Sequence, residues 1–347
     1  MLTTAQLNFD ILSALGQQGR NSKVYLVHDR QLDAQIVAKQ ILKTKFKSPT
    51  EFFEEAKKLY DSEHQHVVQI KYACEDANHI YLAMPYYKNG SLKNLIDPKF
   101  LTVRKIIRYA TQFLSGLHNI HVKKLIHFDI KPDNILISDS DEALVSDFGL
   151  SSSMNSLGFS GVAAVYPKQI PPEYFTQSHH SMLYDIFDCG LTLYRMCNGN
   201  KQYNQQGSLY TTQADYIHAI QSGKFPDRTS YLPHIPKSLR KVINKSIEVD
   251  QSKRHQTVLE MMNDLAGIND LLDWQYSENL GTSQWELDLD DKIFSVTLTS
   301  SGSLFDINTN KTMKNSGNTT KVHALCKTGL VLKDVEKTVS QFLLAAT

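Results

Sequence analysis

The sequence HFDIKPDN occupies residues 127–134, and SDFG follows at residues 146–149. The two stretches carry carboxylate, ammonium and amide side chains at short spacings: Asp129, Lys131, Asn134 and Asp147. Two apolar runs lie between them, ILIS at 135–138 and ALVS at 143–146, and they predict a β-hairpin. Because a hairpin would bring the ends of the two stretches together, we interpret them as one site.

These residue types suit the transfer of a γ-phosphoryl group, which needs charge neutralisation and in-line positioning more than covalent chemistry. Asp129 could orient an acceptor hydroxyl and accept its proton. Lys131, two residues further along an extended loop, would point the same way and contact the γ-phosphate. Asn134 and Asp147 offer the hard oxygen ligands that Mg²⁺ prefers.

The two stretches together resemble the catalytic loop and the DFG segment of the protein-kinase family. A lone DFG is an ordinary glycine turn, whereas HxDxKPxN with DFG thirteen residues after Asn134 is a specific joint pattern. The resemblance covers about residues 9–270 and implies ATP and Mg²⁺ as cofactors. Because Lys131 and Pro132 follow Asp129, the chain resembles the Ser/Thr type of the family, and its turn sequence and compact lobes resemble those of eukaryotic-like kinases from bacteria. The implied partner is therefore a protein substrate.

A glycine-containing turn, LGQQGRNSKV at 15–24, resembles the family's phosphate-covering loop. It departs from the family pattern by one inserted residue and by a serine in place of the third glycine. The resemblance implies four ATP-binding positions here: Gly16, Gly19, Ser22 and Val24.

The stretch IVAK at 36–39 resembles the family's lysine-bearing strand, so Lys39 is the implied phosphate-contacting cation. We predict a helix over residues 50–63 with Thr50 as its N-cap. On this helix Glu55 matches the glutamate that pairs with the strand lysine. Two neighbours on the same helix are rivals for that role, Glu51 and Glu54.

The resemblance also implies a purine site and a structural frame around the catalytic loop. The further residues implied to bind the nucleotide are Ala38, Met84, Pro85, Tyr87 and Leu136. Asp185, in DIFDCG, would anchor the catalytic loop. Glu173, in PPE, would form a buried ion pair with Arg254.

Phe128 departs from the family, because an arginine usually stands between the histidine and the catalytic aspartate. That arginine normally pairs with a phosphate on the activation loop. We therefore expect activity that does not depend on such a phosphate. The loop serines are possible autophosphorylation sites: Ser151, Ser152, Ser153, Ser156 and Ser160.

The fold class implied is α+β, with a bilobal protein-kinase fold and a further small domain. We expect a sheet-rich lobe over residues 1–87, a mainly helical lobe over 88–272 and an α+β domain over 273–347. Apolar residues recur every three or four positions from Val103 to Ile120, which predicts a long buried helix. The last domain is interpreted either as a module for a substrate or partner or as a structural cap.

The composition is that of a folded chain of 347 residues, with 41% hydrophobic and 21% charged residues. The formal net charge of +1 gives no field that favours nucleic acid. The start lacks the pattern of a signal peptide, and no apolar run reaches about 18 residues, so we expect no membrane association. The four cysteines form no CxxC pair and suit a cytoplasmic protein. No pattern indicates an oligomeric state.

Two alternatives to an active protein kinase remain. A pseudokinase would bind nucleotide or a partner without phosphoryl transfer, and the irregular glycine turn supports it. A small-molecule kinase would share the fold, but Lys131 and the PPE stretch argue against it. The joint presence of Lys39, Asp129, Asn134 and Asp147 favours the active enzyme.

Overall fold

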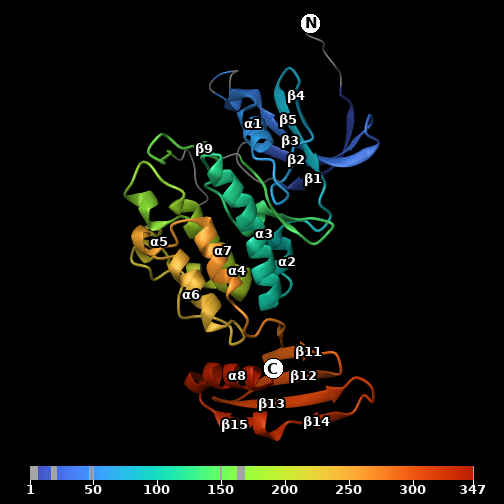
Figure 1. Cartoon of the computed structure of the whole chain (residues 1–347), viewed down its shortest axis with the longest axis vertical. Coiled ribbons are helices and arrows are strands. Elements are labelled where there is room, and N and C mark those ends of the chain that lie inside the picture. Colours follow the sequence, from blue (N-terminus) through green and yellow to red (C-terminus); the bar gives the residue numbers. More distant parts are fainter. Residues whose placement is uncertain are drawn as a thin grey trace.

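The computed structural model describes residues 7–16, 22–46, 48, 51–148, 151–161 and 169–346, and the side chain of Glu55 lies outside the described part. Three regions follow one another along the longest axis of the molecule (Figure 1): a sheet with one helix, a helical region, and a second sheet with one helix. The predicted α+β class with two kinase-like lobes and an added domain is confirmed.

The first region is a five-stranded antiparallel sheet with the order β1-β2-β3-β5-β4. Its strands are β1 (Phe9–Gly16), β2 (Ser22–Asp29), β3 (Ala34–Leu42), β4 (Tyr72–Glu75) and β5 (His79–Pro85). A short 3₁₀ turn, Lys43–Lys45, follows β3. Successive side chains of a strand point to opposite faces, so Ala38 and Val27 pack on one face and Ile41 and Leu82 pack on the other, with α1.

Helix α1 (Glu54–Asp61) is shorter than the predicted helix over 50–63. Phe53 holds the N-cap position and makes no side-chain capping bond, while Thr50 lies outside the described residues. The phenylalanines before the helix pack against the sheet rather than starting the first helical turn. The helix therefore begins where polar residues can face solvent.

The helical region contains the core of the molecule. Its helices are α2 (Leu92–Ile96), α3 (Val103–Val122), α4 (Leu183–Ser208), α5 (Gln213–Gln221), α6 (Lys237–Ser246) and α7 (Val258–Ala266). Short strands and 3₁₀ turns lie between them: β6 (Leu125–Ile126), Pro132–Asn134, β7 (Ile135–Ile137), β8 (Ala143–Val145), β9 (Ser152–Ser153), Pro172–Phe175 and Gln251–Lys253. Helix α3 is capped by Thr102 and buries the predicted three-and-four-residue stripe, including Ile106, Phe113 and Leu117. A break at Gly199, with φ of 79°, divides α4.

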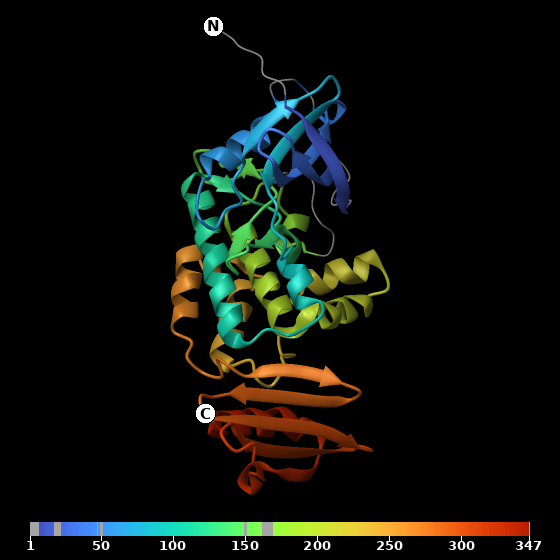
Figure 2. The same cartoon turned by 90° about the vertical axis from the view of Figure 1, so that its right-hand side faces the viewer.

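The C-terminal region is a six-stranded antiparallel sheet in which β15 joins β13 outside the main order. Its elements are β10 (Gln275–Asn279), β11 (Thr282–Asp288), β12 (Lys292–Ser301), β13 (Leu304–Met313), β14 (Thr319–Lys321), His323–Leu325, β15 (Lys327–Leu330) and α8 (Leu332–Ala346). Figure 2 shows α8 lying against this sheet, below the helical region. Val339 and Leu343 of α8 are fully buried beside Val296 and Ile307 of the sheet.

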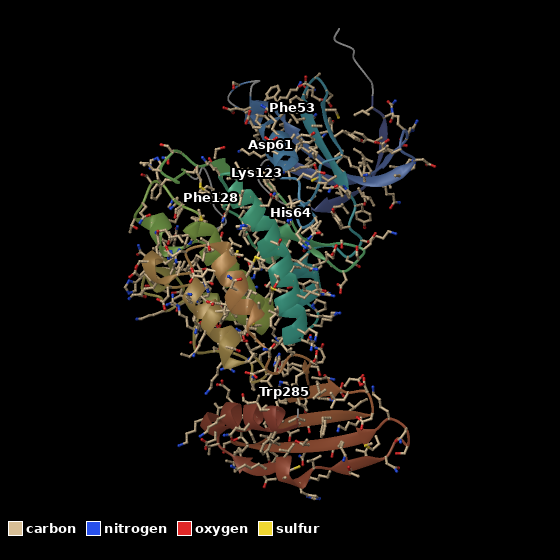
Figure 3. All side chains as sticks on the ribbon, viewed as in Figure 1. Phe53, Asp61, His64, Lys123, Phe128 and Trp285 are labelled. Atoms are coloured by element: carbon tan, nitrogen blue, oxygen red, sulfur yellow. The ribbon has the colours of Figure 1, made fainter. Side chains whose placement is uncertain are left out.

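The C-terminal sheet packs directly on the helical region. Trp285, which Figure 3 shows at the junction, donates its indole N–H to Nδ1 of His234 at 3.2 Å. The His234 ring stacks on Tyr276 with 5.4 Å between centroids. Arg240 pairs with Glu336 of α8, and Arg104 makes a two-pronged contact with Asp273. Among the described residues, no helix has the length and apolarity needed to cross a membrane.

Candidate active site

The hairpin of β7 and β8 brings the two sequence stretches together. Ile135 pairs with Val145, and the backbone carbonyl of Asn134 accepts bonds from the backbone N–H and the hydroxyl of Ser146 at 2.9 and 2.8 Å. Asp147 is the next residue after Ser146. The end of the catalytic-loop stretch therefore lies beside the start of the DFG segment, as the sequence spacing predicted.

Asp129 is held by two neighbours on its own loop. The Lys131 ammonium lies 2.7 Å from each carboxylate oxygen, and Nδ2 of Asn134 donates to Oδ2 at 2.7 Å. The side chains of Asp129 and Lys131 are only 11% and 13% exposed. Burial raises the pKa of Asp129 although the Lys131 charge opposes the rise. A carboxylate with a raised pKa is a better proton acceptor.

Asp147 is paired with the lysine of the small lobe. Nζ of Lys39 donates to Oδ1 of Asp147 at 2.8 Å, and the two side chains are 9% and 35% exposed. Asp147 has φ of 62°, a left-handed conformation that a non-glycine residue adopts only when its surroundings hold it there. Glu55 sits on α1, but its side chain lies outside the described residues.

Asp185, at the start of α4, binds the backbone of the catalytic loop. Its two carboxylate oxygens accept the N–H groups of His127 and Phe128, each at 2.8 Å, and His121 contacts it at 2.8 Å through Nε2. Asp185 is fully buried. The carboxylate therefore fixes the residues directly before Asp129.

Phe128 lies in an aromatic cluster that the sequence did not indicate. Its ring contacts Tyr184 and His180 edge to face, with centroid distances of 5.1 and 6.3 Å. Tyr174 stacks on His180 at 6.0 Å. Phe128 is 2% exposed, and Figure 3 shows it in the helical region. Apolar and ring contacts thus fill the place where the family has a cation.

Glu173 and Arg254 form a buried two-pronged pair. Nη1 and Nη2 of Arg254 lie 2.8 and 2.7 Å from the two oxygens of Glu173. Arg254 also donates to the Leu183 carbonyl at 2.9 Å and its guanidinium stacks on Phe187. The pair ties the 3₁₀ turn Pro172–Phe175 to the end of the 3₁₀ turn Gln251–Lys253, between α6 and α7.

The sheet register corrects one predicted nucleotide contact. Val24 pairs with Lys39, and Met84 pairs with Val37, so these four side chains share one face of the sheet. Ala38 lies on the opposite face, 2% exposed in a cluster with Ile36 and Ala83, and does not face Lys39. Because side chains two apart share a face, Val37 takes the position that we predicted for Ala38.

The other residues predicted to bind the nucleotide lie at and after the end of β5, on β7 and in the glycine turn. Pro85 ends β5, and Tyr87 follows it with its carbonyl bonded to the Gly90 N–H at 3.0 Å. Leu136, on β7, bridges to Ser91 of the segment after Tyr87. In the glycine turn, Gly16 ends β1 opposite Val24 and Ser22 begins β2, while Gly19 lies outside the described residues.

The donor set of Asn134 and Asp147 fits a hard divalent cation. The Asn134 side-chain amide donates through Nδ2 to the backbone carbonyl of Asp129 at 2.9 Å and to Oδ2 of Asp129 at 2.7 Å. These two bonds use both amide hydrogens, so the side-chain oxygen Oδ1 of Asn134 is the atom that would bind a metal. Within the described ranges, no group of three or more His, Cys, Asp or Glu side chains is arranged to bind a metal. A cation here would therefore need further oxygen ligands from phosphate or water.

Fold and site geometry together define a protein-kinase-like phosphotransfer scaffold, and comparison with known proteins gives the family. The model of the protein kinase domain matches residues 9–265, and the chain belongs to this family. A probable serine/threonine-protein kinase of Clostridium perfringens is 29% identical over 75% of this chain and 38% of its own length.

Two further bacterial relatives match a similar share of the chain. The probable serine/threonine-protein kinase PknB of Lactococcus lactis is 24% identical, over 74% of this chain and 41% of its own length. The serine/threonine-protein kinase PrkC of Bacillus subtilis is 25% identical, over 74% and 40%. The chain thus spans about two fifths of the length of these relatives.

Proposed function

We propose that the chain is a protein kinase that transfers the γ-phosphate of ATP, with Mg²⁺, to Ser or Thr hydroxyls of a protein substrate. The observation that carries the proposal is the arrangement of Asp129, Lys131 and Asn134 within hydrogen-bond distance of one another. The printed names of the relatives, which are serine/threonine-protein kinases, support the choice of acceptor.

In this proposal Asp129 orients the acceptor hydroxyl and takes its proton. The hydroxyl oxygen forms the new bond to phosphorus, the bond between the γ-phosphorus and the bridging oxygen breaks, and ADP leaves with that oxygen. The raised pKa of the Asp129 carboxyl, caused by burial, favours proton uptake. The Lys131 ammonium lies 2.7 Å from both oxygens of Asp129, and in this proposal it neutralises charge on the γ-phosphate.

Asn134 and Asp147 would hold Mg²⁺, which supplies charge neutralisation at the phosphates. Lys39 is the cation from the small lobe, and its bond to Asp147 links that lobe to the metal-binding segment. Val24, Val37, Met84 and Leu136 would bound the purine, and the backbone from Pro85 to Tyr87 would bind its edge. Glu55 is the proposed partner of Lys39.

The aromatic surroundings of Phe128 support activity that needs no loop phosphate. A phosphate near this residue would meet rings and no arginine from the catalytic loop. The backbone pairing of Ser160 with His180, at 2.8 and 2.7 Å, also ties the loop to the helical region without any modification.

The C-terminal domain is proposed to be a structural cap on the large lobe. The buried Trp285–His234 bond and the stacking of His234 on Tyr276 support this role, because both residues would be exposed without their partners. A tethered recognition module would need no such buried contact.

The proposal is tested by incubating the protein with γ-labelled ATP, Mg²⁺ and a generic protein substrate. We expect label on Ser and Thr, and we expect Asp147→Ala to abolish the Mg²⁺-dependent transfer while the protein stays folded by circular dichroism. Label transfer by Asp147→Ala at the wild-type rate would remove the metal assignment. Transfer to a sugar or aminoglycoside in preference to protein would favour the small-molecule alternative.

A further inference from the structure

Among the residues that the structure describes, contacts of several kinds join the α1 segment to the large lobe. Leu59 is 2% exposed and belongs to the core cluster of the large lobe. Beyond the end of the helix, the Ser62 carbonyl accepts from Nδ2 of Asn119 on α3 at 3.0 Å. Directly before Leu59, Nζ of Lys58 donates to the backbone carbonyl of Ser151 at 2.6 Å.

The Ser151 carbonyl belongs to a fixed turn that directly follows the DFG segment. Ser151 is 5% exposed, and its N–H and hydroxyl both donate to the Phe148 carbonyl, at 3.0 and 2.8 Å. The next residues form β9, which pairs with β6 just before the catalytic loop. The carbonyl is therefore held from both sides, and Lys58 connects α1 to this turn.

The position of Lys58 on the helix makes this contact relevant to the site. Residues three apart are neighbours on one helical face, so Lys58 shares a face of α1 with position 55, which carries the proposed partner of Lys39. The Lys58 bond is charge-assisted, and such bonds are shorter and stronger than neutral ones. Its acceptor is a backbone carbonyl, so the contact needs no phosphate.

We propose that Lys58 is a positioning residue that holds α1 against the turn after Asp147, and so keeps the small lobe aligned for phosphoryl transfer. This inference rests on the proposed kinase function. Lys58 holds α1, and the aromatic cluster around Phe128 holds the catalytic loop. Neither element therefore depends on a phosphorylated residue for its position. Loss of the Lys58 bond to Ser151 weakens the hold on α1, while Leu59 and the Ser62–Asn119 bond remain, and Lys58 is not one of the proposed nucleotide-binding residues.

The test compares Lys58→Met, Lys58→Arg and Lys57→Met in the full chain. Lys57 is exposed and adjacent on the same helix, so Lys57→Met is the matched control. We expect Lys58→Met to lower kcat about tenfold with little change in KM for ATP, because one charge-assisted bond is lost away from the nucleotide. Lys58→Arg should recover most of kcat, since it can donate to the same carbonyl, and Lys57→Met should match the wild type.

Backbone amide exchange measured by mass spectrometry gives a readout that does not depend on activity. Lys58→Met should speed exchange in the α1 peptide about tenfold, and Lys57→Met should not. Wild-type exchange in Lys58→Met, or wild-type kcat despite faster exchange, would overturn the positioning role. A wild-type protein that binds ATP but transfers no phosphate would instead overturn the proposed function, and the exchange result would still decide whether Lys58 holds α1.

Discussion

Asp185 accepts the backbone N–H of Phe128 through Oδ1 at 2.8 Å, and this bond holds a residue whose φ is 65°. A left-handed conformation costs a bulky residue of order 1–3 kcal/mol, so the carboxylate stabilises strain directly before Asp129. Its other oxygen accepts the His127 N–H, which means that both oxygens are needed.

Asp185→Asn should therefore destabilise the protein by about 2 kcal/mol, because an amide has one acceptor oxygen and one buried N–H is left without a partner. Urea unfolding followed by tryptophan fluorescence measures this difference. The control is Asp139→Asn, an exposed residue at the β7–β8 turn, for which we expect no change. Equal midpoints for the two variants would contradict the anchoring role.

Glu173→Gln should destabilise the fold by about 3 kcal/mol, because it leaves the buried Arg254 guanidinium without its counter-charge. Asp273→Asn is the matched control, since it breaks an arginine–carboxylate pair whose side chains are 60% and 48% exposed. That exposed pair should contribute under about 1 kcal/mol. Chemical unfolding of both variants checks the contrast, and similar losses would contradict the burial argument.

The loop serines differ in their surroundings, so replacing them should have different effects. Ser153 and Ser156 are exposed, whereas the Ser160 hydroxyl donates to Ser152 at 2.7 Å. We expect the double variant Ser153→Ala, Ser156→Ala to keep kcat within about twofold. Ser160→Ala should lower stability by about 1 kcal/mol. Steady-state kinetics and thermal unfolding separate the two effects.

A more than tenfold loss of kcat in the double variant, at unchanged melting temperature, would show that loop phosphorylation controls activity. The variant in which all five serines are replaced should keep substantial activity. It should also be less stable than the wild type, because it lacks the hydrogen bonds of the Ser151 and Ser160 hydroxyls.

The junction with the C-terminal domain should make stability depend on pH through His234. Burial, with a smaller contribution from the Arg240 charge, lowers the pKa of His234 to about 3 in the folded protein, against an ordinary value of 6.5. The unfolded chain therefore binds a proton that the folded protein excludes between these values. The stabilising contribution is complete above pH 6.5 and is lost as the pH falls toward 3.

The His234 contribution to the free energy of unfolding should fall by about 1.4 kcal/mol between pH 7.5 and pH 5.5. His234→Asn keeps an acceptor near the Trp285 indole but does not titrate. The free energy of unfolding of this variant should therefore fall by about 1.4 kcal/mol less than that of the wild type over the same pH interval. Urea unfolding of both proteins at the two pH values measures the difference. Parallel losses would mean that His234 is not the group responsible.

Local sequence patterns predicted the elements around the site better than the contacts between them. The spacing between Asn134 and Asp147 was enough to predict their hairpin, because strand pairing over a short turn is a local property. The prediction of Ala38 as a nucleotide contact was wrong because adjacent strand residues point to opposite faces, and the two-residue period from Lys39 leads to Val37. That period was available in the sequence.

Contacts between distant segments could not be predicted in the same way. Lys58 and Ser151 are 93 residues apart, and Trp285 and His234 are 51 apart. Nothing in the local pattern around either residue specifies its partner, because the partner is determined by how whole elements pack. Helix α1 begins at Glu54, later than the predicted start at residue 50, and this difference has a similar cause, since Phe52 and Phe53 pack on the sheet.

The most direct test of the account compares phosphate transfer from γ-labelled ATP by the wild type, Asp129→Asn and Asp139→Asn. Asp129→Asn removes the proton acceptor while keeping the size of the side chain, so the rate should fall by about 10²–10⁴ with ATP binding retained. Asp139→Asn should transfer label at the wild-type rate. Transfer by Asp129→Asn at the wild-type rate would contradict the central role given to Asp129.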